Sequence, residues 1–214
     1  YDTRRDFTPV TLMVTVPNVM TMYAGVPAAT LKEVIALAKA NPGKYNYGTP
    51  GTLTSGHLTM EMLKLAAGID ITYVPYKGGA PAITDLIGGQ IQFLISGPPG
   101  VLPHIKSGRL KAIGTTALQR LPWLPDTPTF NEQGFNVETA SFYGLAGPAK
   151  LPQPIVNKMH DEIVKILRTP DEIRRLADNG AFPVGDTPAQ FAATIRADVQ
   201  KWGKIIRSVG IKAD

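Results

Sequence analysis

Hydrophobic positions along the chain fall into short continuous runs and into helical stripes. The apolar, β-branched runs Val10–Val16, Val19–Tyr23 and Ile91–Ile95 predict buried strands. Between such runs, apolar residues recur with helical spacing. A first helix is expected after Thr30, because Thr30 and Glu33 have the spacing of a capping box. Strands that alternate with helices in this way are typical of an α/β protein with mostly parallel sheets flanked by helices.

The same patterns give the remaining elements. Further strands are expected at Tyr45–Tyr47, Ile71–Pro75, Leu110–Thr115 and Phe142–Ala146. Further helices are expected on a stripe of Leu58, Met62 and Leu65, after Lys77–Pro81, around Leu102–Lys106, at Pro154–Leu167, at Pro170–Asn179 and from Thr187 to about Val209. The last two are expected to be capped by Thr169 with Glu172 and by Thr187 with Gln190. The segment Leu121–Pro128 holds three prolines and is predicted to be a linker or crossover.

Composition narrows the class of protein. With 214 residues, of which 43% are hydrophobic and 18% charged, the chain can bury a substantial core. The 21 glycines and 19 prolines imply many sharp loops and exclude a helical bundle as the main architecture. There is no cysteine, which excludes disulfides, thiolate metal sites and cysteine nucleophiles. A chain without cysteine suits an oxidising compartment such as the periplasm.

The charge pattern bears on partners. The net charge of +5 is not gathered into a basic run or a basic stripe with aromatics, so no nucleic-acid partner is expected. A mildly positive field favours anionic ligands. The uncharged stretch Phe7–Leu31 is long enough to span a bilayer, but three prolines interrupt it. We interpret it as buried strands with loops.

Three strand-to-helix loops are rich in glycine and hydroxyl residues: Gly48–Gly56, Tyr76–Ala80 and Ser96–Gly100. In open α/β sheets, ligands bind at the carboxyl ends of strands, where the following helices present N–H groups and the positive ends of their dipoles. Together the loops predict an anion site made mostly of backbone. Any single loop would be explained equally well by turns and caps.

The first loop has the glycine spacing of a nucleotide P-loop, but His57 stands where the lysine should be. This favours a cradle for a carboxylate or a similar small anion over one for a triphosphate. Ser55 directly precedes a predicted helix and is interpreted as its N-cap. Lys77 is interpreted either as a partner of the anion or as a solvated lysine. The candidate ligand-binding residues are Thr49, Gly51, Thr54, Ser55, Tyr76, Lys77, Gly78, Gly79, Ser96 and, as an aromatic that could line a cleft, Phe142.

No catalytic or metal constellation is predicted. The three histidines, His57, His104 and His160, are scattered and lack the spacing of metal ligands, and structural or surface roles are expected for each. No pair of carboxylates is placed for acid–base chemistry. We therefore expect no catalytic residue, no metal and no cofactor.

Several segments resemble one family. The similar segments are Asp6–Val10, Leu31–Glu33, Ala36–Gly43, Val74–Ala82, Leu102–Ile105, Pro125–Thr129 and Tyr143–Leu145, in order along the whole chain. They resemble the substrate-binding receptors of tripartite tricarboxylate transporters, the Bug-type periplasmic proteins, and Val74–Ala82 is the most specific piece. The resemblance implies a two-lobed fold like the type II periplasmic binding proteins. It also implies a carboxylate held by loop amides, hydroxyls and water, and no enzymatic activity.

The chain departs from the family pattern in three places. In the loop Thr49–His57, the residues Pro50, Leu53 and Thr54 replace the usual Ser, Gly and Ser. Ser96 stands where many members have an acidic residue, which disfavours amino acids as ligands. Members also carry a strand and a Pro/Gly-rich loop upstream of the point that corresponds to Tyr1. The first lobe is therefore expected to lack its N-terminal part.

The resemblance also implies a division of the chain. Residues 1–23 would form the end of the first lobe and the crossing strands, 24–122 the second lobe, 123–140 a crossover, and 141–214 the return to the first lobe. A complete receptor is expected to be monomeric. A protein that begins at Tyr1 is expected to bind organic acids weakly and to associate through an exposed sheet edge.

The function expected from these observations is that of a periplasmic receptor. It would bind a small organic anion, a di- or tricarboxylate, and deliver it to membrane transporter subunits. Two alternatives stay open: a small α/β enzyme for an acyl or phosphoryl substrate, with Ser55, His57 and Lys77 in its site, and a sensory domain of the same fold.

Overall fold

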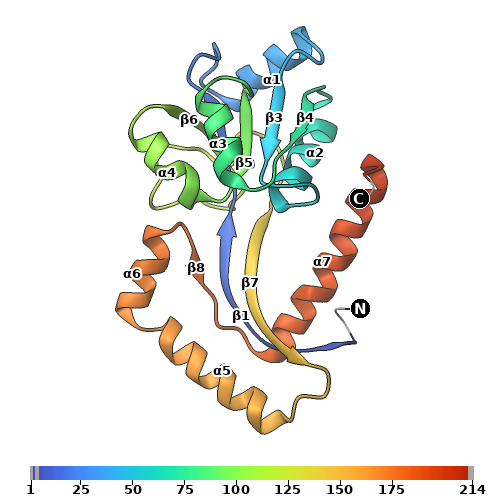
Figure 1. The fold of residues 1–214 in the computed structure, drawn as a ribbon, viewed down its shortest axis with the longest axis vertical. Helices are drawn as coiled ribbons and strands as arrows, with labels where there is room; N and C mark the ends of the chain where they lie inside the picture. The colour runs from blue at the N-terminus through green and yellow to red at the C-terminus, as the bar shows by residue number, and fades with distance from the viewer. Residues whose placement is uncertain (1, 3–4, 212–214) are drawn as a thin grey trace. The chain divides into compact units, whose positions relative to one another are not determined.

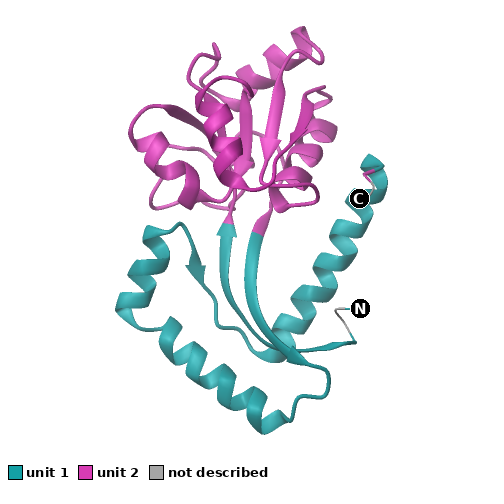
Figure 2. Cartoon of the chain, viewed as in Figure 1, with its two compact units in different colours: residues 1–16, 141–210 teal, residues 17–140, 211–214 magenta. Residues whose placement is uncertain are grey.

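The computed structural model describes residue 2 and residues 5–211 (Figure 1). The chain forms two compact units, coloured separately in Figure 2. Unit 1 combines the described residues up to Val16 with Ser141–Gly210, and unit 2 is built on Pro17–Ala140. The chain changes unit within two long strands, β1 (Phe7–Pro17) and β7 (Ala140–Pro148). No described helix is both long enough and apolar enough to cross a membrane.

Unit 2 contains a five-stranded sheet in the order β4-β3-β5-β2-β6. Its strands are β2 (Val19–Tyr23), β3 (Asn46–Thr49), β4 (Thr72–Pro75), β5 (Phe93–Ser96) and β6 (Leu110–Thr115). The central β3 pairs in parallel with β4 and β5, whereas β2 is antiparallel to β5 and β6. Four of the five strands therefore run in one direction and β2 opposes them. The predicted α/β architecture with mostly parallel strands is confirmed for this unit.

Helices cover both faces of this sheet. They are α1 (Leu31–Ala40), α2 (Ser55–Ala67), α3 (Gly79–Ile87) and α4 (Pro98–Lys106). On β5, Phe93 and Ile95 belong to a core cluster with buried side chains of α1 and α2, whereas Leu94 between them lies outside it. Successive strand residues point to opposite faces, so α1 and α2 share one face. The other face receives α3 and α4, which contact β5 and β6 respectively.

The buried face of α2 differs from the predicted stripe. Leu65, which we expected to be buried, is 58% exposed. Leu58 is buried as predicted and Met62 packs against the core cluster, whose members on α2 are Met60, Leu63 and Ala67. The buried face continues to Gly56, where a Cβ atom would overlap the carbonyl oxygen of Ile95 on β5. Only glycine lets the first turn of α2 lie directly on the strand.

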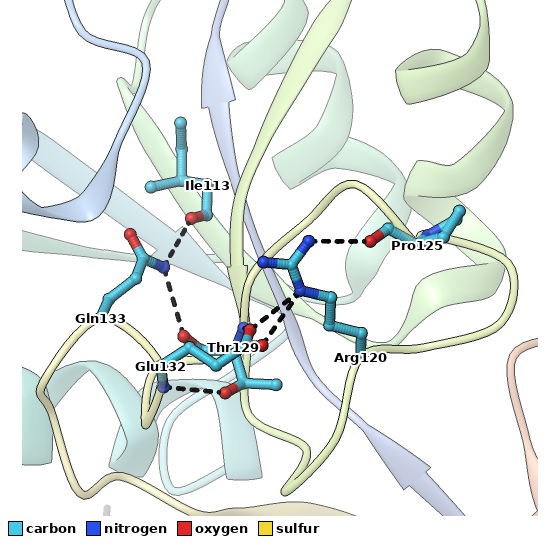
Figure 3. A network of polar contacts seen from close by, with 6 residues as sticks. All are labelled: Ile113, Arg120, Pro125, Thr129, Glu132 and Gln133. Carbon is cyan, nitrogen blue, oxygen red and sulfur yellow. Dashed lines mark hydrogen bonds and ion pairs between the residues drawn. The ribbon is translucent and has the colours of Figure 1, made fainter.

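The segment after β6, predicted to be a linker or crossover, is folded into unit 2. Figure 3 shows its polar network, in which the Arg120 guanidinium pairs with the Glu132 carboxylate at 3.1 Å. Glu132 also accepts the Thr129 N–H at 2.7 Å, and its own N–H donates to the Thr129 hydroxyl. The Phe130 side chain, fully buried, belongs to the core cluster. Residues 123–140 therefore complete the α1–α2 face of the sheet, a role that three prolines in the sequence concealed.

The network also reaches α1. The amide nitrogen of Gln133 donates to the Ile113 carbonyl on β6 at 3.0 Å, and its amide oxygen accepts the Leu31 N–H at 3.0 Å. The predicted cap of α1 is confirmed, since the Thr30 hydroxyl accepts the Glu33 N–H at 3.2 Å. The Glu33 carboxylate accepts from Ala29 rather than from Thr30. A side chain distant in sequence thus adds a second cap to the helix.

Unit 1 contains a three-stranded sheet in the order β7-β1-β8, with β8 (Phe182–Pro183) antiparallel to β1. Its helices are α5 (Gln153–Leu167), α6 (Pro170–Asp178) and α7 (Pro188–Val209). The predicted caps of α6 and α7 are confirmed, including the full capping box of Thr187 and Gln190. The two-residue β8 was not predicted, because a strand of this length leaves no period to detect.

The contact between Gly56 and β5 generates a prediction. Replacing Gly56 with Ala forces α2 away from the Ile95 carbonyl and should lower the free energy of unfolding by about 3 kcal/mol, the upper end for overpacking. Gly88→Ala is the matched control in the same unit, because its Cβ would make only an ordinary contact, 3.5 Å from the Thr84 carbonyl oxygen. Urea unfolding measures both variants. Equal stability of the two would show that α2 does not depend on this close approach.

Candidate functional site

The three loops singled out in the sequence lie at one edge of the unit 2 sheet. Strands β4, β3 and β5 are neighbours and run parallel, so their carboxyl ends meet at the same edge. From these ends the chain leads into α3, α2 and α4, which begin at Gly79, Ser55 and Pro98. Their placement at this edge is confirmed, and it is the position in which α/β sheets bind ligands.

The N-termini of these three helices share a feature. Their N-cap residues are Thr54, Gly78 and Gly97, and none of the three makes a side-chain hydrogen bond to its helix in the described structure. The first helix of the same unit, α1, does receive such a cap from Thr30. Uncapped helix starts present backbone N–H donors and the positive end of the helix dipole. Three of them at one sheet edge form a surface suited to an anion.

The loop between β3 and α2 turns its hydroxyls inward. The Gly51 carbonyl accepts the Thr49 hydroxyl at 2.9 Å and the Thr54 hydroxyl at 2.7 Å. A hydroxyl has one proton to donate. Thr49 and Thr54 therefore hold the shape of the loop, which leaves backbone N–H groups and the exposed Thr52 hydroxyl as donors for an anion.

The interpretation of Ser55 as the N-cap is wrong. Thr54 is the N-cap, with an extended backbone, and Ser55 is the first helical residue. The Ser55 hydroxyl donates to the side-chain oxygen of Asn18 at 3.3 Å. The reason is the hydrogen bond from Thr54 to Gly51, which closes the turn one residue before the position expected from the helical pattern.

The backbone of this loop is strained at Leu53. Its φ is 61°, and among the described residues only Lys150 is also a non-glycine residue with a positive φ. For a residue with a Cβ atom, the left-handed conformation costs about 1–2 kcal/mol. Leu53 is also the position at which the resemblance places a glycine. The Leu53 N–H donates to Nδ1 of His57 at 3.0 Å, which offsets part of this cost.

The loop after β4 is tied to the first loop. The Gly78 N–H donates to the Pro50 carbonyl at 2.8 Å, and Gly78 adopts a φ of 113° that favours glycine. The Tyr76 hydroxyl donates to the Asp85 carboxylate on α3 at 2.7 Å. Burial, with this hydrogen bond, raises the pKa of Tyr76 to about 12. Tyr76 is therefore a neutral structural contact, whereas Lys77 is exposed at the loop surface.

The third loop begins at Ser96, which is buried at the end of β5 and donates to the Gly97 carbonyl at 3.4 Å. Across the sheet, Val19 of β2 pairs with Ser96 on one side and with Thr115 of β6 on the other. The Thr115 hydroxyl is fully buried and has no partner among the described residues. Sequence reasoning missed Thr115, although its place at the end of a correctly predicted strand was a usable signal.

A buried polar cluster, formed by Asn18, Ser55, Thr59, Thr116 and Thr139, lies beside the first turn of α2. The Thr59 and Thr139 hydroxyls are 2.6 Å apart, and the Asn18 N–H donates to the Thr116 hydroxyl at 2.9 Å. The Thr116 hydroxyl also donates to the Thr139 carbonyl. The cluster joins the start of β2, the end of β6, the start of β7 and α2. Except for Ser55, sequence reasoning missed it, because its members come from separate segments.

Phe142 lies apart from these loops along the chain, in β7 of unit 1. Its ring makes an edge-on contact with Phe191, with ring centroids 5.9 Å apart. It also lines a cavity of about 680 Å³ whose other walls are Phe7, Ala146, Ile195, Asp198, Val199, Trp202, Gly203 and Ile206. This surround is mostly apolar. The role of Phe142 in ligand binding stays a prediction, as do the roles of the nine loop residues.

His57 is buried in the first turn of α2, and its ring stacks on Tyr73 of β4 with centroids 4.0 Å apart. Burial lowers the pKa of His57 below its ordinary value, Glu61 opposes this shift, and Lys64 adds to it. The other histidines are separate: His160 contacts Asp161 on α5, and His104 lies on α4. The described residues contain no group of three or more potential metal ligands.

Comparisons with known proteins agree with the family resemblance found in the sequence. The model of the tripartite tricarboxylate transporter family receptor matches residues 1–211. A UPF0065 protein in the tcbD-tcbE intergenic region of Pseudomonas sp. (strain P51) is 31% identical, and the match covers 100% of this chain and 64% of that protein. Protein BugT of Bordetella pertussis is 31% identical over 99% of this chain and 65% of its own length. The chain therefore spans just under two thirds of these relatives.

Solved structures agree. One described as a periplasmic transporter has a TM-score of 0.92 at 38% identity, over 100% of this chain and 72% of that chain. R. palustris Rpa4515 with adipate has a TM-score of 0.92 at 31% identity, over 99% of this chain and 71% of that chain. MatC from Rhodopseudomonas palustris with bound malate has a TM-score of 0.86 at 27% identity, over 96% and 71%. The resemblance and the periplasmic-binding-protein-like fold are confirmed.

The buried cluster generates a prediction about stability. Thr59→Val keeps the shape of the side chain but leaves the Thr139 hydroxyl without this partner, so the free energy of unfolding should fall by about 1–3 kcal/mol. Thr84→Val is the matched control, because the Thr84 hydroxyl makes the same bond to the carbonyl four residues earlier but is exposed on α3. That change should stay within about 0.5 kcal/mol. Urea unfolding measures both variants, and equal losses of unfolding free energy in Thr59→Val and Thr84→Val would refute the role of the cluster.

The link between the two loops generates another prediction. Gly78 and Gly79 both have open space where a Cβ atom would stand, and only Gly78 has a positive φ. Gly78→Ala should therefore cost about 1–3 kcal/mol through backbone strain alone, because a φ of 113° with a ψ of 169° is essentially restricted to glycine. Gly79→Ala should be neutral or stabilising by up to about 1 kcal/mol, because alanine favours the helix. The comparison is made by thermal and urea unfolding, and an unaffected Gly78→Ala protein would contradict the strained geometry.

Proposed function

The chain belongs to the tripartite tricarboxylate transporter receptor family, and from this premise we propose that it serves as a periplasmic receptor for a small organic carboxylate. The ligand class is a di- or tricarboxylate, which the receptor passes to membrane transporter subunits. Receptors of this kind bind and release their ligand without changing it.

The observation that carries the proposal is the convergence of three uncapped helix N-termini at the carboxyl edge of one sheet. The starts of α2 and α3 offer N–H donors and a partial positive charge, whereas α4 begins with Pro98 and Pro99, which lack an N–H, and contributes mainly the positive end of its dipole. The side-chain hydroxyls of Thr49 and Thr54 are engaged within their loop, so recognition rests mainly on the backbone. A carboxylate has two acceptor oxygens and fits several such donors at once.

The nature of the ligand is supported by two observations. Adipate and malate are bound in the R. palustris neighbours, and both are dicarboxylates. In this chain the buried residue at the end of β5 is the neutral Ser96, so this position supplies no carboxylate for the amine of an amino acid. The exposed Lys77, beside the N-terminus of α3, adds a positive charge that suits a second carboxylate.

The geometry disfavours the enzyme alternative. In that alternative His57 would be the general base, and it would need a ring nitrogen free to accept the proton of the nucleophile. Nδ1 of His57 is already occupied by the Leu53 N–H, and the ring is buried against Tyr73. The family and its structural neighbours are receptors rather than enzymes.

The length of the relatives bears on how complete the site is. The chain spans 64% of the Pseudomonas relative and 65% of BugT. The three loops all belong to unit 2. In the proposal these loops hold the carboxylate, and the role of Phe142 of unit 1 stays a separate prediction. Weak binding and self-association of a protein limited to this chain stay predictions.

The proposal is tested with dicarboxylates of known composition. Malate and adipate should raise the melting temperature of the chain, and the neutral diamide of adipate should not, because it lacks the charge that the helix starts recognise. The expected stabilisation grows with ligand concentration and reaches about 2.7 kcal/mol at one hundred times the dissociation constant. Calorimetry gives the affinity, and NMR spectra of the ligand should remain unchanged over hours.

The matched glycine variants sharpen this test. Gly78→Ala should weaken binding of the acids at least tenfold because it displaces the start of α3, whereas Gly88→Ala, at the other end of the same helix, should leave the affinity within a factor of two to three of the parent. Consumption of the acid would favour an enzyme. Equal binding of adipate and its diamide would remove the anion site from the proposal.

A further inference from the structure

The strained residue of the first loop is held by a titratable side chain. Leu53 has a φ of 61°, and its N–H donates to Nδ1 of His57 at 3.0 Å. His57 lies four residues further on, in the first turn of α2, and only 3% of it is exposed. The strained conformation of Leu53 and the hydrogen bond that compensates its cost therefore lie in the same turn.

The His57 ring is fixed by a second ring that also contacts the loop. It stacks on Tyr73 at a centroid distance of 4.0 Å and an interplanar angle of 11°. The Tyr73 hydroxyl lies 3.4 Å from the Thr49 hydroxyl and 3.3 Å from the Thr52 hydroxyl. Two stacked rings thus contact the loop at three positions, directly before the N-terminus of α2.

We propose that neutral His57 is a positioning residue for this loop, and that protonation of its Nδ1 releases Leu53 and with it the donors that face the ligand. The consequence for ligand binding rests on the proposed function, whereas the effect on the loop does not. His57 acts through Leu53 and need not touch the ligand.

The chemistry of the ring gives the switch its direction. Nδ1 can accept the Leu53 N–H only when the ring is neutral and carries its proton on Nε2. Protonation places a hydrogen on Nδ1, the second N–H of the ring, and directs it at the Leu53 N–H. Two donors then face each other in a buried place, and Leu53 loses the bond that holds its strained conformation.

Four ionisable groups act on the ring: Tyr47 on β3, Tyr73 on β4, and Glu61 and Lys64 on its own helix. The Glu61 carboxylate would favour a charged ring, but the same oxygen already accepts the Tyr47 hydroxyl at 2.6 Å and the Lys64 ammonium at 2.8 Å. Burial, together with this hydrogen bond to Glu61, keeps Tyr47 neutral by raising its pKa. Burial is consequently the strongest influence on His57 and lowers its pKa from 6.5.

The pH window follows from this direction. The unfolded or released loop leaves His57 with its ordinary pKa near 6.5, and the folded loop has a lower one. The loop is therefore fully held above the unfolded value. It is released as the pH falls through the lowered pKa of the folded state.

The first test needs no ligand. In an NMR pH titration of the free chain, the Leu53 amide and the His57 ring should move together, with one midpoint below 6.5. His57→Asn keeps an acceptor at the position of Nδ1 that does not titrate, so the transition should vanish and the high-pH loop should persist. His57→Phe keeps the stacking without the acceptor, so the Leu53 amide should exchange with solvent at least tenfold faster at pH 8.

A second variant, Leu53→Gly, provides a test that does not depend on whether the His57 variants fold. Leu53→Gly removes the strain, so the loop should keep its high-pH geometry through the titration of His57. The proposal would be overturned if the NMR shift of the Leu53 amide did not change as His57 titrates, or if this amide exchanged with solvent no faster in His57→Phe than in the parent. If His57→Phe does not fold, the titrations of the parent, His57→Asn and Leu53→Gly proteins still decide it.

The binding arm uses malate. Its affinity for the parent chain should fall at least tenfold across the His57 transition, beyond the loss that His57→Asn shows from titration of malate itself. Equal losses in the two proteins would remove control of binding from His57. If malate and adipate bind at no pH, the proposed function fails, while the ligand-free titration still decides whether His57 holds the loop.

Discussion

The close approach of α2 to β5 is the contact on which the arrangement of the sheet edge depends. At Gly56 the helix lies so near the Ile95 carbonyl that no residue with a Cβ atom fits. This contact sets how closely the first turn of α2 lies against β5, and therefore where its N–H groups lie relative to the ends of β3 and β5. It also turns Met60, Leu63 and Ala67 toward the core and places Thr59 beside Thr139. One missing Cβ atom thus affects both the packing of a face and the geometry of the sheet edge at which we propose that an anion binds.

The buried polar cluster has a related role at the point where the chain enters and leaves unit 2. Asn18 follows the last residue of β1, and Thr139 precedes the first residue of β7. Both are bound to Thr116, and Thr139 is bound to α2 through Thr59. A buried polar group that loses its hydrogen-bond partner costs free energy, so these residues favour the one arrangement in which their hydrogen bonds are kept. Asn18 and Thr139, near the two ends of the unit 2 segment, are therefore anchored to α2, whose N-terminus lies at the proposed anion-binding edge.

The sequence predicted features that depend on near neighbours. The caps at Thr30, Thr169 and Thr187 and the strand Leu110–Thr115 are encoded within a few residues, and the structure confirms them. The three loops were placed correctly because parallel strands bring their carboxyl ends to one edge.

Features set by distant contacts were missed. The face of α2 depends on β5, the fold of 123–140 depends on Phe130 entering the core, and the polar cluster joins separate segments. The error at Ser55 is of the same kind on a smaller scale, since the hydrogen bond from Thr54 to Gly51 moved the helix start by one residue.

Leu53 shows how a residue in a backbone conformation that favours glycine can be supported locally. A glycine at this position would adopt a φ of 61° without strain, and the loop would need no additional support. A leucine there makes the loop conformation depend on the acceptor at His57. The bond that compensates the strain is made by a side chain whose charge changes in mildly acidic solution. The cost of replacing glycine is thus not only a loss of stability. It couples the geometry of the ligand edge to the protonation of one buried ring, which a glycine-containing loop would not do.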